Sequence, residues 1–410
     1  MSEKKSKTLL ACAMFTIAAL FYFYEFLLRV APSVMYAELA QEFDIAATQF
    51  GILVSAWYWA YAPLQLPVGI WMDKWGPRRL LTFAIVLCAL STVILALTHS
   101  FYLACIMRGF IGAGSAFAFI SCMKITAIWF SNRLFPLLVG ITLTLGTLGG
   151  ASSSLISQGL DFLPWRVLLL WLGGLGLILG ALAWIVIRDE NPTKQESVEE
   201  SPDLSFWHCL KTVALQPQSW LIGIYAFLVT APTDTFGGSW GAAYLMHGHG
   251  LAKAEAASAQ AMTFVGMAVG SPILGWLAGH FNYKIPMLCS SLLAAIFLSI
   301  LIYWPHINFF NASLLFFLFG STGTYVLAYV VIRHLNEFNY VGTAVGFVNM
   351  ISMIGSGFLI GFVGWILDLV RGPSTPLYTL ADYHLGLMVL PIFYAVSALI
   401  VVPLIRGQNA

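Results

Sequence analysis

"GIWMDKWGPRR" occupies residues 69–79 and lies between two apolar segments, residues 48–71 and 79–98. Each segment has about 20 mostly apolar residues, the length that an α-helix needs to cross a bilayer. The stretch between them contains Lys74, Arg78 and Arg79. Short loops rich in Lys and Arg stay on the cytosolic side of a membrane. The stretch therefore predicts a cytosolic turn between two membrane-spanning helices.

The composition extends this interpretation to the whole chain. Of its 410 residues, 60% are hydrophobic and 9% are charged, the net charge is +1 and the mean hydropathy is +0.85. Soluble globular chains are about 25% charged, so this chain cannot cover itself with solvated side chains. We expect a multi-pass membrane protein whose main partner is the lipid bilayer. Nucleic acid is not expected as a partner, because no basic patch exists outside short loops.

The chain carries no motif that is typical of an enzyme or a metal site. It has neither a Gly-rich phosphate loop with Lys nor a GxSxG motif. Its six cysteines are scattered without CxxC spacing, and its eight histidines lack the spacing of metal ligands. We expect no enzymatic activity, no cofactor and no metal.

The chain contains twelve segments that are long and apolar enough to span a membrane, which predicts an all-α membrane protein. Between the sixth and the seventh lies an acidic stretch with Pro and Ser, residues 188–205, typical of a flexible linker. We expect a six-helix bundle at 1–187, a cytosolic linker at 188–216 and a second six-helix bundle at 217–410. The expected spans are 9–36, 48–71, 79–98, 101–124, 134–160, 165–187, 217–246, 254–278, 284–303, 308–333, 342–368 and 384–405.

The distribution of Lys and Arg predicts the orientation in the membrane. If the N-terminus is cytosolic, the outside loops contain only Arg166, Lys253 and Arg371. All the other loops with Lys or Arg then face the cytosol, as the positive-inside rule requires. The apolar region after "MSEKKSK" is too long for a signal peptide, so it is expected to be an uncleaved first span. Both termini are predicted to be cytosolic.

The two halves of the chain repeat each other. Four glycines of the first half recur in the second half, each displaced by 206 positions: Gly69, Gly114, Gly140 and Gly149 recur as Gly275, Gly320, Gly346 and Gly355. Small residues let helices approach closely within each half. Parallel repeats with a substrate site at the midplane are typical of secondary transporters that work by alternating access.

Residues 69–79 resemble the signature of the major facilitator superfamily, a Gly followed by Asp and a basic cluster in the loop between helices 2 and 3. This resemblance implies two pseudo-symmetric six-helix bundles. It also implies that Asp73, with Arg78 and Arg79, belongs to a gate. Asp73 is expected to face the start of the helix near residue 342, where the helix dipole stabilises an anion, and to latch the outward-open state. The second-half copy has Gly279 in place of the Asp, so the latch is one-sided.

Two further motifs fit the same family. "RGFIGAG" (108–114) resembles the family's Arg-containing motif in helix 4, and we expect Arg108 to brace the contact between helices 1 and 4. "GTLGG" (146–150) resembles a glycine motif of antiporters but lacks its Pro. The second motif keeps open an exporter of drugs or siderophores.

Longer stretches narrow the resemblance to one bacterial subgroup. "FYEFLLRVAPSVM", "YAPLQLPVGIWMDKWGPRRLL" and "GSAFAFISCMKITAIWF" look like the phagosomal nutrient transporters of intracellular pathogens, which have lysosomal relatives in animals. This implies uptake of amino acids or similar small polar nutrients across a bacterial inner membrane. In the similar sugar-acid symporters an acid commonly lies seven residues after the helix-4 Arg. Ser115 stands there in this chain, which argues against their proton-coupling scheme.

Glu25 and Arg29 lie four residues apart in the first span, where charges are costly and therefore indicate function. The Arg29 guanidinium fits a carboxylate bidentately. Glu25 could hold Arg29, bind a substrate ammonium or titrate; a purely structural ion pair is the alternative. Asp234 lies within one position of the repeat equivalent of Arg29, 29 + 206 = 235, so it is expected at similar depth in helix 7.

Other polar residues in the spans complete the candidate substrate site. Tyr61 and Gln65 are one turn apart in helix 2, although Trp and Tyr there could also serve packing or an interfacial belt. Tyr325 and Tyr329 in helix 10 and Asn349 in helix 11 are candidates in the second half.

The sequence predicts a monomeric secondary active transporter that takes up an amino acid or related zwitterion with a proton. An amino acid explains the charges, because its carboxylate suits Arg29 and its ammonium suits Asp234 or Glu25. An exporter and a transporter-like receptor that does not translocate remain as alternatives.

Overall fold

The computed structural model describes residues 2–131, 133–189, 206–336, 340–371 and 378–405, and within these ranges every regular element is a helix. The first half contains the following helices: α1 (Ser2–Val34), α2 (Tyr36–Phe43), α3 (Ala47–Leu64), α4 (Val68–Leu97), α5 (Phe101–Ser115), α6 (Ala118–Trp129), α7 (Phe135–Ala151), α8 (Ser153–Gly159) and α9 (Trp165–Val186). A chain that spans a membrane without forming a closed β-barrel must do so with helices, because every backbone N–H and C=O group must be paired inside the bilayer.

The second half follows the same plan. It contains α11 (Pro217–Pro232), the π-helix η1 (Thr233–Trp240), α12 (Gly241–His249), α13 (Lys253–His280), α14 (Lys284–Tyr303), α15 (Phe309–Ser321), α16 (Tyr325–Leu335), α17 (Val341–Val370), α18 (Leu380–Leu387), α19 (Val389–Val396), the π-helix η3 (Ser397–Val401) and α20 (Val402–Leu404). One helix was not predicted, α10 (Phe206–Leu215) within the expected linker 188–216, and it lies at 82° to the segment that follows.

The described ranges contain ten helices that are long and apolar enough to span a membrane, or eleven if Trp207–Leu215 and Pro217–His249 count as one bent span. Of the twelve expected spans, the one at residues 48–71 is therefore not among these helices. There α3 ends at Leu64 and α4 begins at Val68, after a turn that contains Pro67. Gln49, Tyr58 and Tyr61 also make α3 less apolar than a lipid-facing helix. Instead, α3 packs between α5 and α17.

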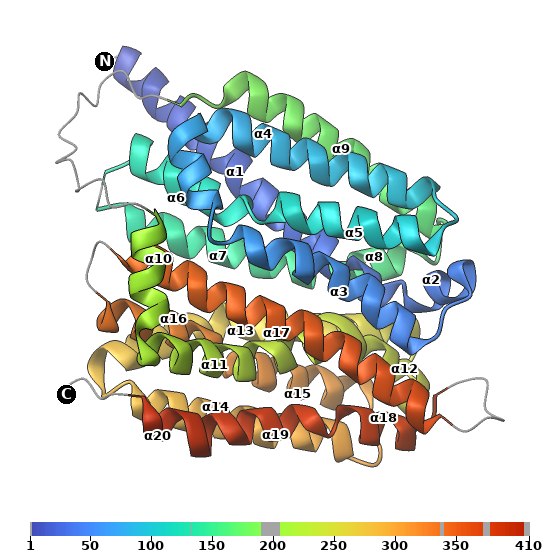
Figure 1. Ribbon diagram of the computed structural model, residues 1–410. Helices are drawn as coiled ribbons and strands as arrows, with labels where there is room; N and C mark the ends of the chain where they lie inside the picture. Colours follow the sequence, from blue (N-terminus) through green and yellow to red (C-terminus); the bar gives the residue numbers. More distant parts are fainter. Residues whose placement is uncertain (1, 132, 190–205, 337–339, 372–377, 406–410) are drawn as a thin grey trace.

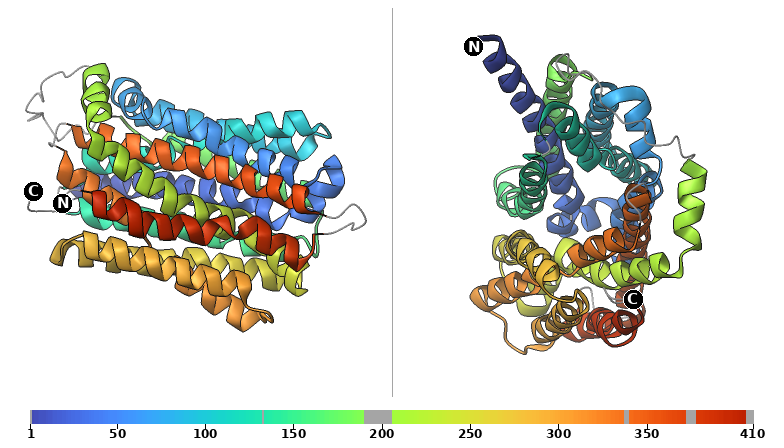
Figure 2. Two further views of the ribbon diagram at one scale, coloured as in Figure 1. Left: turned by 60° about the horizontal axis from the view of Figure 1, so that its bottom comes forward. Right: turned by 90° about the vertical axis from the view of Figure 1, so that its left-hand side faces the viewer.

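The helices form two groups that run side by side, α1–α9 above and α11–α20 below in Figure 1. Across the boundary, α3 packs along α17 and α7 packs along α13. An end-on view shows the same two groups, and both chain ends lie at the same end of the helices (Figure 2). The polar candidate residues of both halves therefore meet along one boundary.

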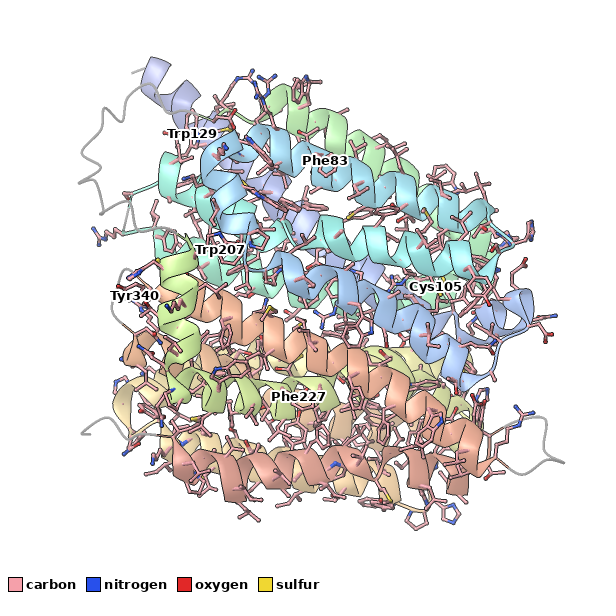
Figure 3. All side chains as sticks on the ribbon, in the orientation of Figure 1. Phe83, Cys105, Trp129, Trp207, Phe227 and Tyr340 are labelled. Carbon is pink, nitrogen blue, oxygen red and sulfur yellow. The ribbon has the colours of Figure 1, made fainter. Side chains whose placement is uncertain are left out.

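Large apolar side chains are exposed on the outward surface of both groups, among them Phe83 in the first (Figure 3) and Leu399 in the second. Phe83, Trp171 and Ile178 are 58%, 66% and 60% exposed. Exposed apolar surface on this scale marks contact with lipid rather than with water. Trp129 and Trp207 lie at the end of the helices that carries the chain termini (Figure 3), as aromatic residues do at a membrane interface.

Two of the repeated glycines lie where the facing helix leaves no room for a side chain. A Cβ on Gly149 of α7 would lie 2.1 Å from the carbonyl oxygen of Phe23 in α1. A Cβ on Gly355 of α17 would lie 1.9 Å from the ring of Phe227 in α11. Gly149 thus lets α7 lie close to α1, and Gly355 lets α17 lie close to α11. This confirms close helix approach within each half at these positions. Gly69 and Gly275 face open space instead.

Candidate functional site

Arg29 of α1 links the two halves of the molecule. Its Nη2 donates to Asp234 Oδ1 at 2.5 Å, and its Nε donates to Tyr58 OH at 3.1 Å. The side chains of Arg29 and Asp234 are each only 11% exposed. A charge is costly in a bilayer unless it is paired, so the two residues stabilise each other's ionised form across the boundary between the halves.

A π-helix presents Asp234 to Arg29. The α-helix α11 ends at Pro232, which has no N–H to donate to the preceding turn. Residues Thr233–Trp240 follow as η1, and Asp234 lies in its first turn. Such π-segments occur often at functional sites. The irregular backbone here lies against α1, α13 and α17, inside the protein, which is where a membrane protein tolerates it.

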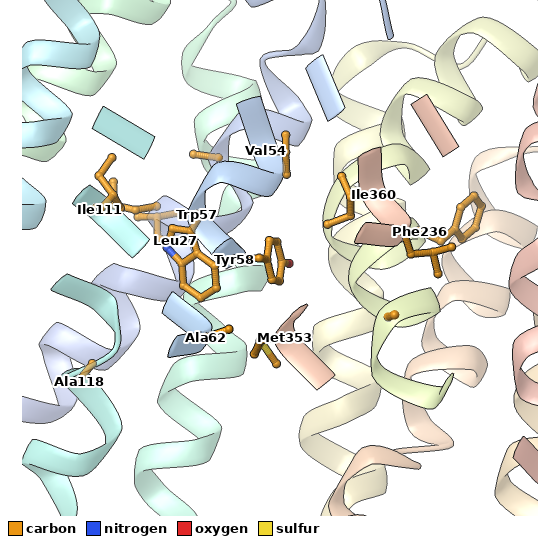
Figure 4. Packing of buried hydrophobic residues seen from close by; sticks show 14 of the residues in the cluster. Leu27, Val54, Trp57, Tyr58, Ala62, Ile111, Ala118, Phe236, Met353 and Ile360 are labelled. Atoms are coloured by element: carbon orange, nitrogen blue, oxygen red, sulfur yellow. The ribbon is translucent and has the colours of Figure 1, made fainter. Parts of the chain in front are cut away.

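Aromatic rings surround the Arg29 guanidinium. Its Cζ lies 5.3 Å from the ring centroid of Phe26, 4.9 Å from that of Trp57 and 5.0 Å from that of Tyr58. These distances suit cation–π attraction. Tyr58 lies on the side of α3 toward Met353 and Ile360, whereas Trp57 lies toward Leu27 and Ile111 (Figure 4). Trp57 also stacks on Tyr61 at 4.5 Å, which places Tyr61 one ring away from Arg29.

Glu25 is not the ion-pair partner of Arg29. In the described part of the chain, the partner within 4.0 Å of Arg29 is Asp234. Glu25 is 1% exposed, and its Oε2 has no hydrogen-bond partner among the described residues. The Oδ2 atom of Asp234 is unpartnered in the same sense. The self-contained pair of Glu25 and Arg29, one alternative from the sequence, is therefore wrong. Two carboxylate oxygens near Arg29 remain open to a proton or an ammonium.

A second polar chain crosses the boundary closer to the chain termini. Tyr329 OH donates to Asn349 Oδ1 at 2.8 Å, and Asn349 Nδ2 donates to Gln65 Oε1 at 2.8 Å. Gln65 belongs to the first half and the other two to the second. Tyr325 lies beside Tyr329, with ring centroids 6.4 Å apart, and accepts a hydrogen bond from Ser271 Oγ. The candidate residues thus form two clusters, one around Arg29 and one around Asn349, and side-chain contacts join the residues within each cluster.

Comparison with known proteins identifies the family. The model of the Major Facilitator Superfamily matches residues 11–239, more than half of the chain and including Arg29 and Asp234. The chain belongs to the Major Facilitator Superfamily. Its overall structure also resembles that of a bacterial homolog of the human lysosomal transporter Spinster in an inward-facing, unoccupied conformation. That match has a TM-score of 0.81 and 16% identity over 96% of each chain, and it shows the fold.

Curated relatives of this superfamily member are transporters by name. It is 27% identical over 180 residues to the uncharacterized transporter YybO of Bacillus subtilis, covering 42% of this chain and 40% of that one. It is 26% identical over 196 residues to the probable sulfoacetate transporter SauU of Cupriavidus necator, covering 47% and 45%. The chain thus matches less than half the length of these two relatives. Transport membership also fits the expectation that the chain is not an enzyme.

Arg108, in the motif that resembles the superfamily's helix-4 signature, contacts the backbone of α1. Its Nη1 donates to the Leu28 carbonyl at 2.9 Å and its Nη2 to the Arg29 carbonyl at 3.3 Å. Arg108 is 1% exposed. The side chain joins α5 to α1 at the residue that forms the central ion pair, so it fixes the backbone from which Arg29 extends.

The other residues of the predicted gate lie near the chain termini. The side chain of Asp73 lies outside the described part of the structure, so its predicted contact with α17 stays a prediction. Arg78 contacts α9, where its Nε donates to the Trp184 carbonyl at 3.0 Å and its guanidinium lies 4.4 Å from the Trp184 ring. Its backbone N–H donates to Asp189 Oδ1 at 2.8 Å. Arg79 is exposed.

Tyr58 was not predicted to be a site residue. Tyr61 on α3 was predicted instead, but Tyr58 is the tyrosine that contacts Arg29 directly. One turn of helix separates the two residues, so periodicity places both on similar faces. The signal that distinguishes them is depth, because Tyr58 is 2% exposed and Tyr61 is half-buried.

Proposed function

We infer that this chain is a secondary active transporter that imports a small zwitterion, such as an amino acid, together with a proton. The observation that carries this proposal is the Arg29–Asp234 ion pair, which joins the two halves at 2.5 Å in an almost buried environment. Membership of a transporter superfamily supports the general activity, whereas the substrate and the proton are our proposal.

A zwitterion can replace both partners of this ion pair at once. Removing one partner of a buried pair leaves the other charge unpaired, which costs about 3–5 kcal/mol. A substrate with one charge that displaced Asp234 from Arg29 would create such a cost. An amino acid avoids it, since its carboxylate can pair with Arg29 while its ammonium pairs with Asp234. Binding would then exchange one contact between the halves for two contacts through the substrate.

Glu25 is our candidate for the coupling proton. It lies one turn from Arg29, is 1% exposed and has an unpartnered carboxylate oxygen. A proton can satisfy a buried carboxylate oxygen that has no other partner. Arrival of a proton at Glu25 would remove one negative charge from the site and so favour entry of the substrate carboxylate.

An organic anion is the second candidate substrate, and the relative named as a probable sulfoacetate transporter favours it. With such a substrate, Asp234 would lose Arg29 as its partner and receive no ammonium in return. Asp234 would then need a proton of its own. The two candidates therefore differ in the number of protons that accompany each substrate.

We further propose that residues 1–187 and 217–410 move as two bodies, joined by 188–216, in a monomer of the bacterial inner membrane. Both termini are expected in the cytosol. Cysteine labelling from each side tests this topology. The thiol of a Phe162→Cys variant should react from outside, and that of a Trp207→Cys variant should react only after permeabilisation. The opposite pattern would overturn it.

Uptake into proteoliposomes tests the substrate. Labelled amino acids, sulfoacetate and hexonates would be supplied with and without an inward proton gradient, and Arg333→Ala, an exposed cation outside the site, would serve as the control. Gradient-stimulated uptake of an amino acid supports the zwitterion. Uptake of anions alone supports the second candidate. Accumulation of neither class under any gradient would overturn the proposed transport of small carboxylates.

A further inference from the structure

Asp368, near the end of α17, caps a helix that belongs to the other half of the molecule. Its Oδ2 accepts the backbone N–H of Thr48 at 2.7 Å, and its Oδ1 accepts that of Ala47 at 3.3 Å. Ala47 and Thr48 are the first residues of α3. The contact lies at the end of the helices opposite the chain termini, which is the outer end in the predicted topology.

Tyr378 reinforces this contact from the same half. Its hydroxyl donates to Asp368 Oδ1 and accepts the Ala47 N–H at 3.0 Å. Asp368 and Tyr378 together therefore occupy two backbone donors of α3.

The start of α3 lacks an acceptor of its own for these donors. Its N-cap residue is Ala46, whose side chain makes no capping hydrogen bond. The first N–H groups of a helix have no partner within the helix, and the helix dipole adds positive charge there. A carboxylate from the second half meets both needs. If the halves separated at this end, α3 would lose its anionic cap, and Asp368 would lose two donors.

Two other contacts close the same end. Lys253 of α13 forms an ion pair with Glu38 of α2, again between the halves. Gly364 of α17 packs so closely that a Cβ there would lie 2.4 Å from the Ala47 carbonyl oxygen. The cap on α3 thus lies in a boundary that is also held by the Lys253–Glu38 ion pair and by the close packing of Gly364 against Ala47.

We propose that Asp368 is an outer latch, a residue whose cap on α3 holds the outer side closed and must release for that side to open. At the other end of the boundary, Asp73 of α4 is predicted to face the start of α17, so each of the two contacts places an acidic residue of one half at a helix start of the other half. This inference rests on the proposed alternating access, but it does not depend on which substrate is carried.

Distance measurements between spin labels test the latch. Phe162 and Phe310 lie on the two halves and are 85% and 71% exposed, so cysteines at these positions can carry the labels once the six native cysteines are replaced. Asp368→Asn removes the charge with little change in shape. We expect it to raise the ratio of outer-open to outer-closed molecules about five-fold.

Two further variants make the result decisive. Asp382 caps α18 within the second half, accepting the Thr379 N–H at 2.7 Å, so Asp382→Asn is a matched control that should leave the distances unchanged. Gly364→Leu is a steric wedge against the Ala47 carbonyl that should force the outer side open while the Asp368 side chain itself is unchanged. If the wedge lengthens the distance but Asp368→Asn does not, the latch is wrong and alternating access stands. If even the wedge leaves one closed population, alternating access itself fails and the latch with it.

Discussion

Arg29 Nη2 lies 2.5 Å from Asp234 Oδ1, although 205 positions of sequence separate the two residues. The ion pair therefore depends on how the two halves are arranged, and any motion that separates them at this depth must break it. Because unpaired charges are costly in a membrane, such a motion requires replacement partners. A substrate that supplies them would couple its own binding to the movement of the halves.

Replacing Arg29 with Lys tests whether the guanidinium holds a carboxylate. Lysine keeps the charge but loses the bidentate geometry. A lost charge-assisted hydrogen bond is worth about 1.5–3 kcal/mol, so we expect affinity to fall about ten- to a hundred-fold in an equilibrium binding assay. An ester of the substrate should lose a similar factor in the wild type and little more in the variant, since two changes to one contact are not additive. Normal transport by Arg29→Ala would contradict the proposal.

The sequence predicted most of the fold because the bilayer imposes simple length and polarity rules on each segment. It also predicted that Asp234 lies at a depth similar to that of Arg29, since the 206-residue repeat makes residue 235 the equivalent of residue 29. The repeat gives depth but not direction. The direction of the Asp234 side chain depends on the π-helix η1, and no spacing pattern in the sequence predicted the wider turns of that helix.

The contact of Asp368 with α3 could not be predicted from the sequence. In the sequence Asp368 is one acidic residue near the end of an apolar span, as a solvated residue at a membrane surface would be. Its role depends on Ala47 and Thr48, some 320 positions away, and on an N-cap residue, Ala46, whose side chain cannot accept their N–H groups. Such a contact follows from the packing of α17 on α3, which local patterns do not contain.

Glu25→Gln separates proton coupling from substrate binding. Glutamine has the size of glutamic acid but cannot release a proton, so the variant mimics a permanently protonated site. We expect uptake driven by a proton gradient to fall at least ten-fold, while exchange of internal for external substrate continues at near the wild-type rate. Proteoliposome assays in both modes measure this. If gradient-driven uptake persists, Asp234 becomes the coupling residue.

Glu42 supports a dependence of stability on pH at the surface. Its Oε1 pairs with His99 Nδ1 at 2.7 Å and accepts from Arg166 Nη2 at 2.5 Å, and these hydrogen bonds lower the pKa of the Glu42 carboxyl. A group with a lowered folded-state pKa stabilises the fold above its unfolded pKa, and this contribution is lost as the pH falls through the folded pKa. Thermal unfolding of Glu42→Gln should show a Tm lower by about 1–2 °C at pH 7.

The same difference should shrink as the pH falls below the ordinary carboxyl pKa of about 4.3 and should vanish below the lowered pKa of Glu42 in the folded protein. Asp161→Asn, an exposed acid in the loop before α9, is the control and should give a constant difference near zero. A gap between wild type and Glu42→Gln that stayed constant down to pH 3 would show that the ion pairs do not contribute.

Asp73→Asn should shift the resting population toward the inward-open state. An anion near the start of a helix contributes about 0.3–1 kcal/mol, and up to about 2 kcal/mol when partly buried, so the shift should be several-fold without loss of either state. Spin labels at Arg133 and Asn282, exposed residues near the chain termini on the two halves, would report it as a longer distance.

Asp368→Asn should shift the population the opposite way. Since the two residues lie at opposite ends of the boundary between the halves, their effects should add, and the double variant should return toward the wild-type distribution. A double variant that opened at both ends together, or that matched either single variant, would show that the two contacts do not oppose each other.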